Sequence, residues 1–168
     1  MKLTHYLKPE QILLNLSGPT KEEGLRLIAR SLASNPISST MGEEVIYEAL
    51  NARENLGSTG IGDGIAIPHA KLPHIDSMVA CFARSQAGID FDAIDKEPVK
   101  LFFALLVPDN SAGLHLKALA RISRLLKSEG FRESLLKMET SDEIYRAFQE
   151  FDEGITAFFA NSLNFRYR

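Results

Sequence analysis

An unbroken apolar run, Leu101–Val107, is the feature that most constrains the fold of this chain. A helix that spans a membrane needs about 20 apolar residues in a row, so this run is too short for one. A β-strand that is covered on both faces, in contrast, appears in a sequence as a continuous apolar segment. We therefore expect a strand over 99–107, in a sheet packed between two layers of helices.

Strand and helix patterns alternate along the chain, which favours an α/β fold. Shorter strands are expected at 12–14, 65–67 and 78–84. The first helix is expected to begin after the N-cap Thr20 and to stop at Asn35-Pro36. A second helix is expected over about 41–54, and a third after the N-cap Ser111, ending at a break in Ser128-Glu129-Gly130. Two further amphipathic helices are expected over about 131–138 and 141–151.

The length and composition exclude several classes of protein. With 168 residues, 45% of them hydrophobic and 24% charged, the chain predicts one globular domain, residues 1–154. A net charge of -3 without a basic block argues against nucleic-acid binding. The N-terminus lacks the pattern of a signal peptide, and no membrane insertion is expected. A single cysteine fits a reducing cytoplasm.

Residues 155–168 are interpreted as a C-terminal extension of the domain. This segment is rich in large apolar side chains and carries Arg166 and Arg168. One interpretation is that it packs on its own domain or is partly disordered. The alternative is that it forms a contact between two copies of the chain or anchors a partner.

The glycine-rich segment 57–64, which leads into the strand 65–67 and then His69, is the most informative stretch for function. Backbone N–H groups without bulky side chains can approach an anion closely, and Ser58, Thr59 and Gly60 would supply such donors. A neutral histidine ring is a nucleophile near pH 7 and a good phosphoryl acceptor. The alternative is an ordinary hairpin-like glycine turn followed by a surface histidine.

Two further residues could act with His69. His115 shares the face of Ala118 and Ile122 on the third expected helix, so its ring should point inward and could donate a hydrogen bond to a phosphoryl oxygen. Arg53 comes just before the glycine-rich segment, and its planar guanidinium suits a phosphoryl group. Taken alone, each is better explained as a structural residue: His115 as a half-buried ring satisfied by the backbone, and Arg53 as a solvated residue at a helix C-terminus.

The other candidate residues indicate no separate chemistry. Cys81 alternates with Val79 and Ala83, which predicts a buried strand position rather than a nucleophile. His5 and His74 lie near turns and are interpreted as surface residues. A metal site at His69 and His115 would lack a nearby third ligand, so no metal or cofactor is expected.

The segment 54–70, ENLGSTGIGDGIAIPHA, resembles the active-site signature of type-2 enzyme IIA domains of the bacterial phosphotransferase system, the fructose/mannitol/nitrogen-type family. That signature begins with an acidic or amide residue and ends with an aliphatic residue, Ala, an aliphatic residue, Pro, His and a small residue. Glu54 and Ile65–Ala70 match these positions, and Ile61-Gly62 matches an aliphatic-small pair between them. His115-Leu116 and Arg53 match the family's second histidine and its arginine.

The resemblance, which covers roughly residues 3–151, implies a fold and an activity. The implied fold is a single α/β domain, a five-stranded mixed β-sheet flanked by α-helices. The implied activity is the relay of a phosphoryl group: His69 accepts it from an HPr-type phosphocarrier protein and hands it on. Arg53, His115, Ser58, Thr59 and Gly60 would assist, and a shallow apolar patch of Ile61, Ile65 and Leu114 would dock the donor.

Two functions within this family remain open at this point. The opening segment, residues 3–33, resembles nitrogen-type members, which favours a stand-alone regulator whose phosphorylation state controls a target protein. The alternative is a sugar-specific IIA component that passes phosphate to a IIB domain for sugar uptake. A binding module that is not phosphorylated is a candidate from another class, and a metal-dependent hydrolase is disfavoured by the missing acidic ligands.

Overall fold

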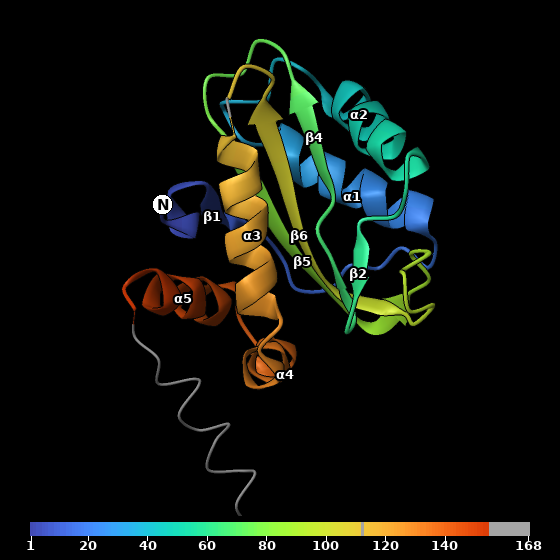
Figure 1. Cartoon of the computed structure of the whole chain (residues 1–168), viewed down its shortest axis with the longest axis vertical. Helices are drawn as coiled ribbons and strands as arrows, with labels where there is room; N and C mark the ends of the chain where they lie inside the picture. The colour runs from blue at the N-terminus through green and yellow to red at the C-terminus, as the bar shows by residue number, and fades with distance from the viewer. Residues whose placement is uncertain (112, 155–168) are drawn as a thin grey trace, which may run out of the picture.

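The computed structural model describes residues 1–111 and 113–154, so the predicted extension 155–168 lies outside the described part (Figure 1). A short 3-10 helix, η1, precedes the first strand, and five α-helices accompany the sheet. In chain order the elements are η1 (Leu3–His5), β1 (Leu7–Leu13), α1 (Lys21–Ala33), α2 (Glu43–Asn55), β2 (Gly60–Gly62), β3 (Ile65–Ala66), β4 (His69–Leu72), β5 (Val79–Ile89), β6 (Val99–Pro108), α3 (Leu114–Leu126), α4 (Glu129–Lys137) and α5 (Ser141–Asp152).

The strands form one mixed sheet in the order β1-β5-β6-β3-β2, and β4 also pairs with β6. Strand β6 is the centre of this sheet, because it pairs antiparallel with β5 and parallel with both β3 and β4. Its residues are buried except Lys100, as the apolar run predicts. The expected α/β fold is therefore confirmed.

The sheet of the described chain has six strands where five were expected, and Pro68 explains the difference. Ile65 and Ala66 of β3 pair with Leu101 and Phe102, and His69 of β4 pairs with Leu105. The offset between the paired residues is the same before and after the interruption, so residues 65–72 follow β6 in one register. Pro68 has no N–H to donate and divides this run into two strands.

Helices cover both faces of the sheet (Figure 1). Helices α1 and α2 pack on one face through a cluster that includes Ile28, Leu50 and Phe102. Helices α3, α4 and α5 pack on the other face, where the fully buried Phe148 makes edge-to-face contacts with Phe82, Phe103 and Phe131. In the part of the chain that the structure describes, no helix is both long and apolar enough to cross a membrane.

Several expected boundaries are confirmed and others are wrong. Thr20 caps α1 by accepting a hydrogen bond from the N–H of Glu23, as predicted. The N-cap of α3 is Gly113, with a φ of +83°, rather than Ser111. Ser128 does separate two helices, but its side chain caps α4, so Glu129 and Gly130 belong to that helix. Strand β1 also begins earlier than expected, at Leu7.

Candidate functional site

The glycine-rich segment forms a β-hairpin. Strands β2 and β3 pair antiparallel, with Gly60 opposite Ala66 and Gly62 opposite Ile65. The two residues between the strands, Asp63 and Gly64, have φ values of +56° and +75°. An Asp-Gly pair with positive φ at both positions is typical of a tight two-residue hairpin turn. The hairpin, which was the alternative interpretation of these glycines, is therefore present.

The polar groups just before the hairpin are engaged within the protein. The Ser58 hydroxyl donates to the carbonyl oxygen of Phe91 at 2.7 Å, and the Gly60 N–H donates to Ser58 Oγ at 3.0 Å. The N–H of Thr59 donates to Glu54 Oε2 at 3.1 Å, and its hydroxyl donates to the same carboxylate. A role for Ser58, Thr59 and Gly60 in phosphoryl binding thus remains a prediction, since these donors already have internal partners.

His69 occupies a strand position with a defined orientation. It is the first residue of β4, and the N–H of its partner Leu105 donates to the carbonyl oxygen of Pro68 at 2.9 Å. Side chains alternate between the two faces of a strand, so His69 and Lys71 share one face while Ala70 and Leu72 pack in the core below α2. The expectation of a histidine held on extended backbone is confirmed.

The hydrogen bond of the His69 ring identifies which ring nitrogen carries the proton. Nδ1 lies 2.8 Å from the carbonyl oxygen of Ile67. A carbonyl can only accept, so Nδ1 carries the proton, and in the neutral ring Nε2 keeps its lone pair. Burial lowers the pKa of His69 from its ordinary value of 6.5, and the charge of Arg53 lowers it further against the opposing effect of the Ile67 hydrogen bond. The ring of His69 is therefore mainly neutral at pH 7, with the lone pair of Nε2 available.

His69, His115 and Arg53 line one pocket of about 620 Å³. The lining residues come from α2 and the residue after it, from β4 and from the start of α3. Strand β4 lies between these two helices (Figure 1). The described residues around the pocket include two cationic side chains and no carboxylate, which suits an anion. They are Ala49, Ala52, Arg53, Leu56, His69, Ala70, Lys71 and His115.

Arg53 and His115 enter the pocket from opposite sides of the sheet edge. Arg53 lies in the last turn of α2, and its Nη1 donates to the carbonyl oxygen of Gly57 at 2.8 Å. Its other guanidinium N–H groups leave capacity for a ligand. His115 lies in the first turn of α3, and its buried Nδ1 has no hydrogen-bond partner among the described residues. The structure therefore brings together the three residues that were predicted to be catalytic.

Lys71 and Leu56 line this pocket but were not predicted from the sequence, and Ile65 was wrongly expected on the surface that docks the donor. Lys71 lies two residues after His69 on the same face of β4. The alternation of side chains along a strand could have predicted this position from the sequence. Leu56, at the end of α2, is 86% exposed beside the pocket. Ile65 is instead fully buried, because its side chain belongs to the core cluster between the sheet and α3. Ile61 and Leu114 are partly buried.

The remaining candidates lie apart from this pocket. Cys81 is fully buried, as expected, and burial raises the pKa of its thiol to about 12. His5 and His74 are exposed. Among residues 1–111 and 113–154, no group of three or more histidine, cysteine, aspartate or glutamate side chains could hold a metal ion.

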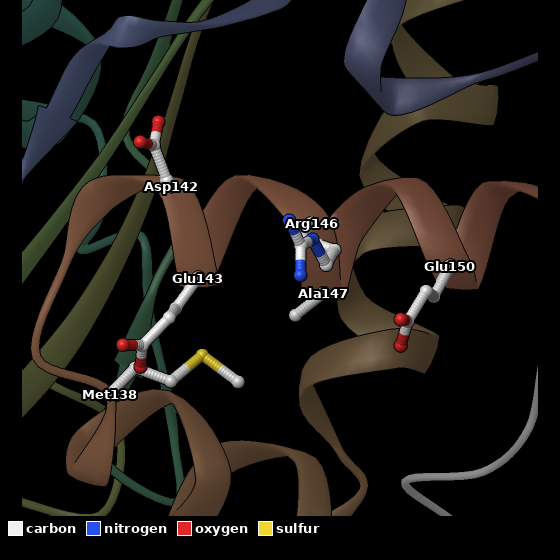
Figure 2. Close-up of a pocket in the computed structure, with 6 residues that line it drawn as sticks. All are labelled: Met138, Asp142, Glu143, Arg146, Ala147 and Glu150. Carbon is white, nitrogen blue, oxygen red and sulfur yellow. The ribbon is translucent and has the colours of Figure 1, made fainter.

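A smaller pocket of about 230 Å³ lies along α5 (Figure 2). Glu143 and Glu150 project to the same side of this helix, and Ala147 and Met138 form its apolar lining. The carboxylate of Glu143 accepts a hydrogen bond from the N–H of Glu139. With no histidine in its lining, this pocket cannot supply the histidine that is expected from the sequence as the phosphoryl acceptor, so it is not the candidate site.

The lowered pKa of His69 makes the stability of the protein depend on pH. Below pH 6.5 the unfolded chain binds a proton that the folded ring resists, so the free energy of unfolding should fall as the pH decreases toward the folded pKa. We expect His69→Asn to remove this part of the pH dependence, as measured by denaturant unfolding between pH 7.5 and 5. His74→Asn is the matched control. An NMR titration midpoint of His69 at or above 6.5 would contradict this prediction.

Comparisons with known proteins place this site in a family. A nitrogen regulatory protein of Bradyrhizobium diazoefficiens is 39% identical over 145 residues, which are 86% of this chain and 93% of that protein. A fructose-specific EIIABC component of Bacillus subtilis is 34% identical over 91% of this chain but 24% of its own length. The crystal structure of nitrogen regulatory protein IIA-Ntr from Neisseria meningitidis superposes with a TM-score of 0.79 and 32% identity, covering 86% of this chain and 97% of that one.

The family model for the phosphoenolpyruvate-dependent sugar phosphotransferase system, EIIA 2, matches residues 5–151. This match includes every residue that lines the pocket around His69. The chain therefore belongs to the EIIA type-2 family of the phosphotransferase system.

Proposed function

We propose that this chain is a phosphohistidine carrier that accepts a phosphoryl group on Nε2 of His69 from an HPr-type phosphocarrier protein in the cytoplasm. The observation that carries the proposal is the hydrogen bond between Nδ1 of His69 and the carbonyl oxygen of Ile67. It leaves Nε2 as the one ring nitrogen with a free lone pair. A neutral, oriented imidazole is the form that attacks phosphorus.

The transfer is an in-line displacement between two histidine rings. The lone pair of His69 Nε2 forms the new N–P bond, and the electron pair of the broken N–P bond returns to the ring of the donor. Positive charge develops on the His69 ring as the new bond forms. The Ile67 carbonyl, which accepts from Nδ1, stabilises that charge.

The pocket supplies cations and donors for the three equatorial oxygens of the phosphoryl group. Arg53 and Lys71 line the pocket together with His69, and neither forms an ion pair with a carboxylate within the described residues. The unpartnered Nδ1 of His115 would gain a hydrogen bond if a phosphoryl oxygen reached it. Groups placed in advance around developing charge stabilise the transition state more than the ground state.

Exposed apolar side chains next to the pocket suit transient docking of the donor. Leu56, at the end of α2, lines the pocket and is 86% exposed, and Leu116, which follows the lining residue His115 in α3, is 63% exposed. Transient partners use small apolar contacts with a polar rim. We assign the docking of an HPr-type protein to this face, with Leu56 and Leu116 in place of the buried Ile65.

Phosphoenolpyruvate, enzyme I and an HPr-type carrier should load this protein with one acid-labile phosphoryl group, detected by intact mass. His69→Ala should abolish the gain because the nucleophile is lost. His115→Ala should slow loading but still reach the same final mass, because its ring assists and does not form the bond. Equal, total loss in both variants would contradict this division of roles.

Replacing the pocket cations should slow the transfer without preventing it. Arg53→Gln should reduce the rate of loading roughly a hundredfold, and Lys71→Gln roughly tenfold because its side chain is exposed to water. The measurement is the time course of phosphorylation under limiting carrier. Arg30→Gln, at an exposed arginine of α1, is the control. An unchanged rate in Arg53→Gln would contradict the role of this pocket.

The downstream role that we propose is that of a nitrogen-type regulator. The support is the similarity to proteins named nitrogen regulatory protein, together with the resemblance of the opening segment. A phosphoryl group on His69 would add negative charge beside Leu56 and Leu116, at the face that a target protein would contact. Such a charge can switch the affinity of a partner.

The alternative is a sugar-specific component that passes phosphate to a IIB domain. The similarity to a fructose-specific protein is the observation that keeps it open. Incubating the loaded protein with a fructose-type IIB domain distinguishes the two. Rapid transfer to IIB would favour the sugar pathway, whereas retention of the phosphoryl group would favour the regulator. No loading by any carrier would instead favour a binding module that is not phosphorylated.

A further inference from the structure

A buried carboxylate lies behind the pocket and does not contact it. Glu54, in the last turn of α2, has a side chain that is 1% exposed. Its carboxylate lies 3.0 Å from Lys21 Nζ, at the start of α1, and accepts from both the N–H and the hydroxyl of Thr59. Burying a carboxylate is costly unless it is paired and hydrogen-bonded, and here three donors share it.

One backbone hydrogen bond and one hydrogen bond from the His69 ring connect this cluster to His69. The carbonyl oxygen of Thr59 accepts from the N–H of Ile67 at 3.1 Å. The carbonyl oxygen of Ile67 in turn accepts from Nδ1 of His69 at 2.8 Å. The N–H and the carbonyl group that take part in these two hydrogen bonds belong to the same residue, Ile67. The position of the Thr59 backbone therefore affects where the Ile67 carbonyl lies relative to the His69 ring.

We propose that Glu54 is a positioning residue that acts through Thr59 and Ile67 to hold the proton of His69 on Nδ1 and to keep Nε2 as the acceptor. The ion pair between Glu54 and Lys21 is costly to bury, and its effect on the orientation and tautomer of the His69 ring would explain its presence. The carboxylate also favours positive charge on His69, the charge that develops during transfer. Lys21, which lies 4.7 Å from the centre of the Phe91 ring, fixes the carboxylate from the other helix.

This inference rests on the proposed function, but it makes a claim about the unphosphorylated protein that can be tested separately. It also gives Thr59 a positioning role in place of the predicted contact with the phosphoryl group. A contact with phosphate would leave the ring of the free protein unchanged when Thr59 is altered. A positioning role would change the ring before any phosphate arrives.

The main variant is Glu54→Gln combined with Lys21→Met. Glutamine removes the charge and one of the two acceptor oxygens, which weakens the hydrogen bonds that Thr59 donates to this side chain. The second substitution avoids leaving the partly buried ammonium of Lys21 beside an uncharged amide, without its partner at 3.0 Å. Thr59→Val, which removes the hydroxyl at nearly constant shape, and Thr59→Ser, which keeps it, form a second pair. Glu48→Gln, at an exposed glutamate of α2, is the control.

The readouts are the tautomer of the neutral His69 ring, from long-range ¹H–¹⁵N NMR spectra of the unphosphorylated protein, and the rate of phosphoryl loading. We expect the double variant and Thr59→Val to raise the fraction of rings protonated on Nε2. The same variants should slow loading roughly ten- to a hundredfold, because a misplaced nucleophile loses its aligned geometry. Thr59→Ser and Glu48→Gln should match the wild type in both readouts.

An unchanged tautomer in folded variants, with a loss of thermal stability alone, would overturn the proposal and leave Glu54 a merely structural residue. An unchanged tautomer in Thr59→Val would do so even if the double variant fails to fold. A shifted tautomer in a protein that never accepts phosphate would support the positioning role while contradicting the proposed function.

Discussion

The pairing of residues 65–72 with β6 is the constraint on which the site depends. Because Ile65 and His69 keep the same offset to their partners on β6, the interruption at Pro68 does not shift the chain. Strand β6 is buried between two layers of helices, so this register is fixed by the whole core. A slip of one residue would turn His69 into the core and Ala70 toward the pocket.

The edge of the sheet explains why two helices from opposite layers can serve one nucleophile. β4 pairs with β6, and its other side borders the pocket, where Arg53 and Leu56 of α2 face His115 of α3. The pocket therefore combines a cation from one layer with a ring from the other. The glycine-rich segment contributes differently, because its hairpin returns the chain to β6 and connects the Glu54 cluster with Ile67.

Much of the fold could be predicted because its signals are local. The N-cap Thr20, the apolar run of β6 and the buried position of Cys81 each follow from a few neighbouring residues. The Asp63-Gly64 turn also has a local sequence signal, but the same glycines could be interpreted either as a hairpin turn or as an anion-binding loop. Ser128 separates two helices and also caps the second one. A sequence pattern that breaks a helix does not show whether the next helix begins at once or after a loop.

The candidate site was predictable in its residue types but not in its contacts. His69, His115 and Arg53 could be named from the family resemblance, yet the hydrogen bond from Nδ1 to Ile67 depends on backbone geometry. The ion pair between Lys21 and Glu54 joins two helices, so no local pattern shows it. Ile65 was placed on the surface because its burial depends on α3, which follows much later in the chain.

The central claim is that Nε2 of His69 carries the phosphoryl group, and ¹⁵N–³¹P coupling in the loaded protein tests it most directly. With ¹⁵N-labelled histidine and loading through enzyme I and an HPr-type carrier, we expect coupling at Nε2 of His69 and at no other histidine nitrogen. Coupling at Nδ1 of His69, or on the ring of His115, would contradict the account.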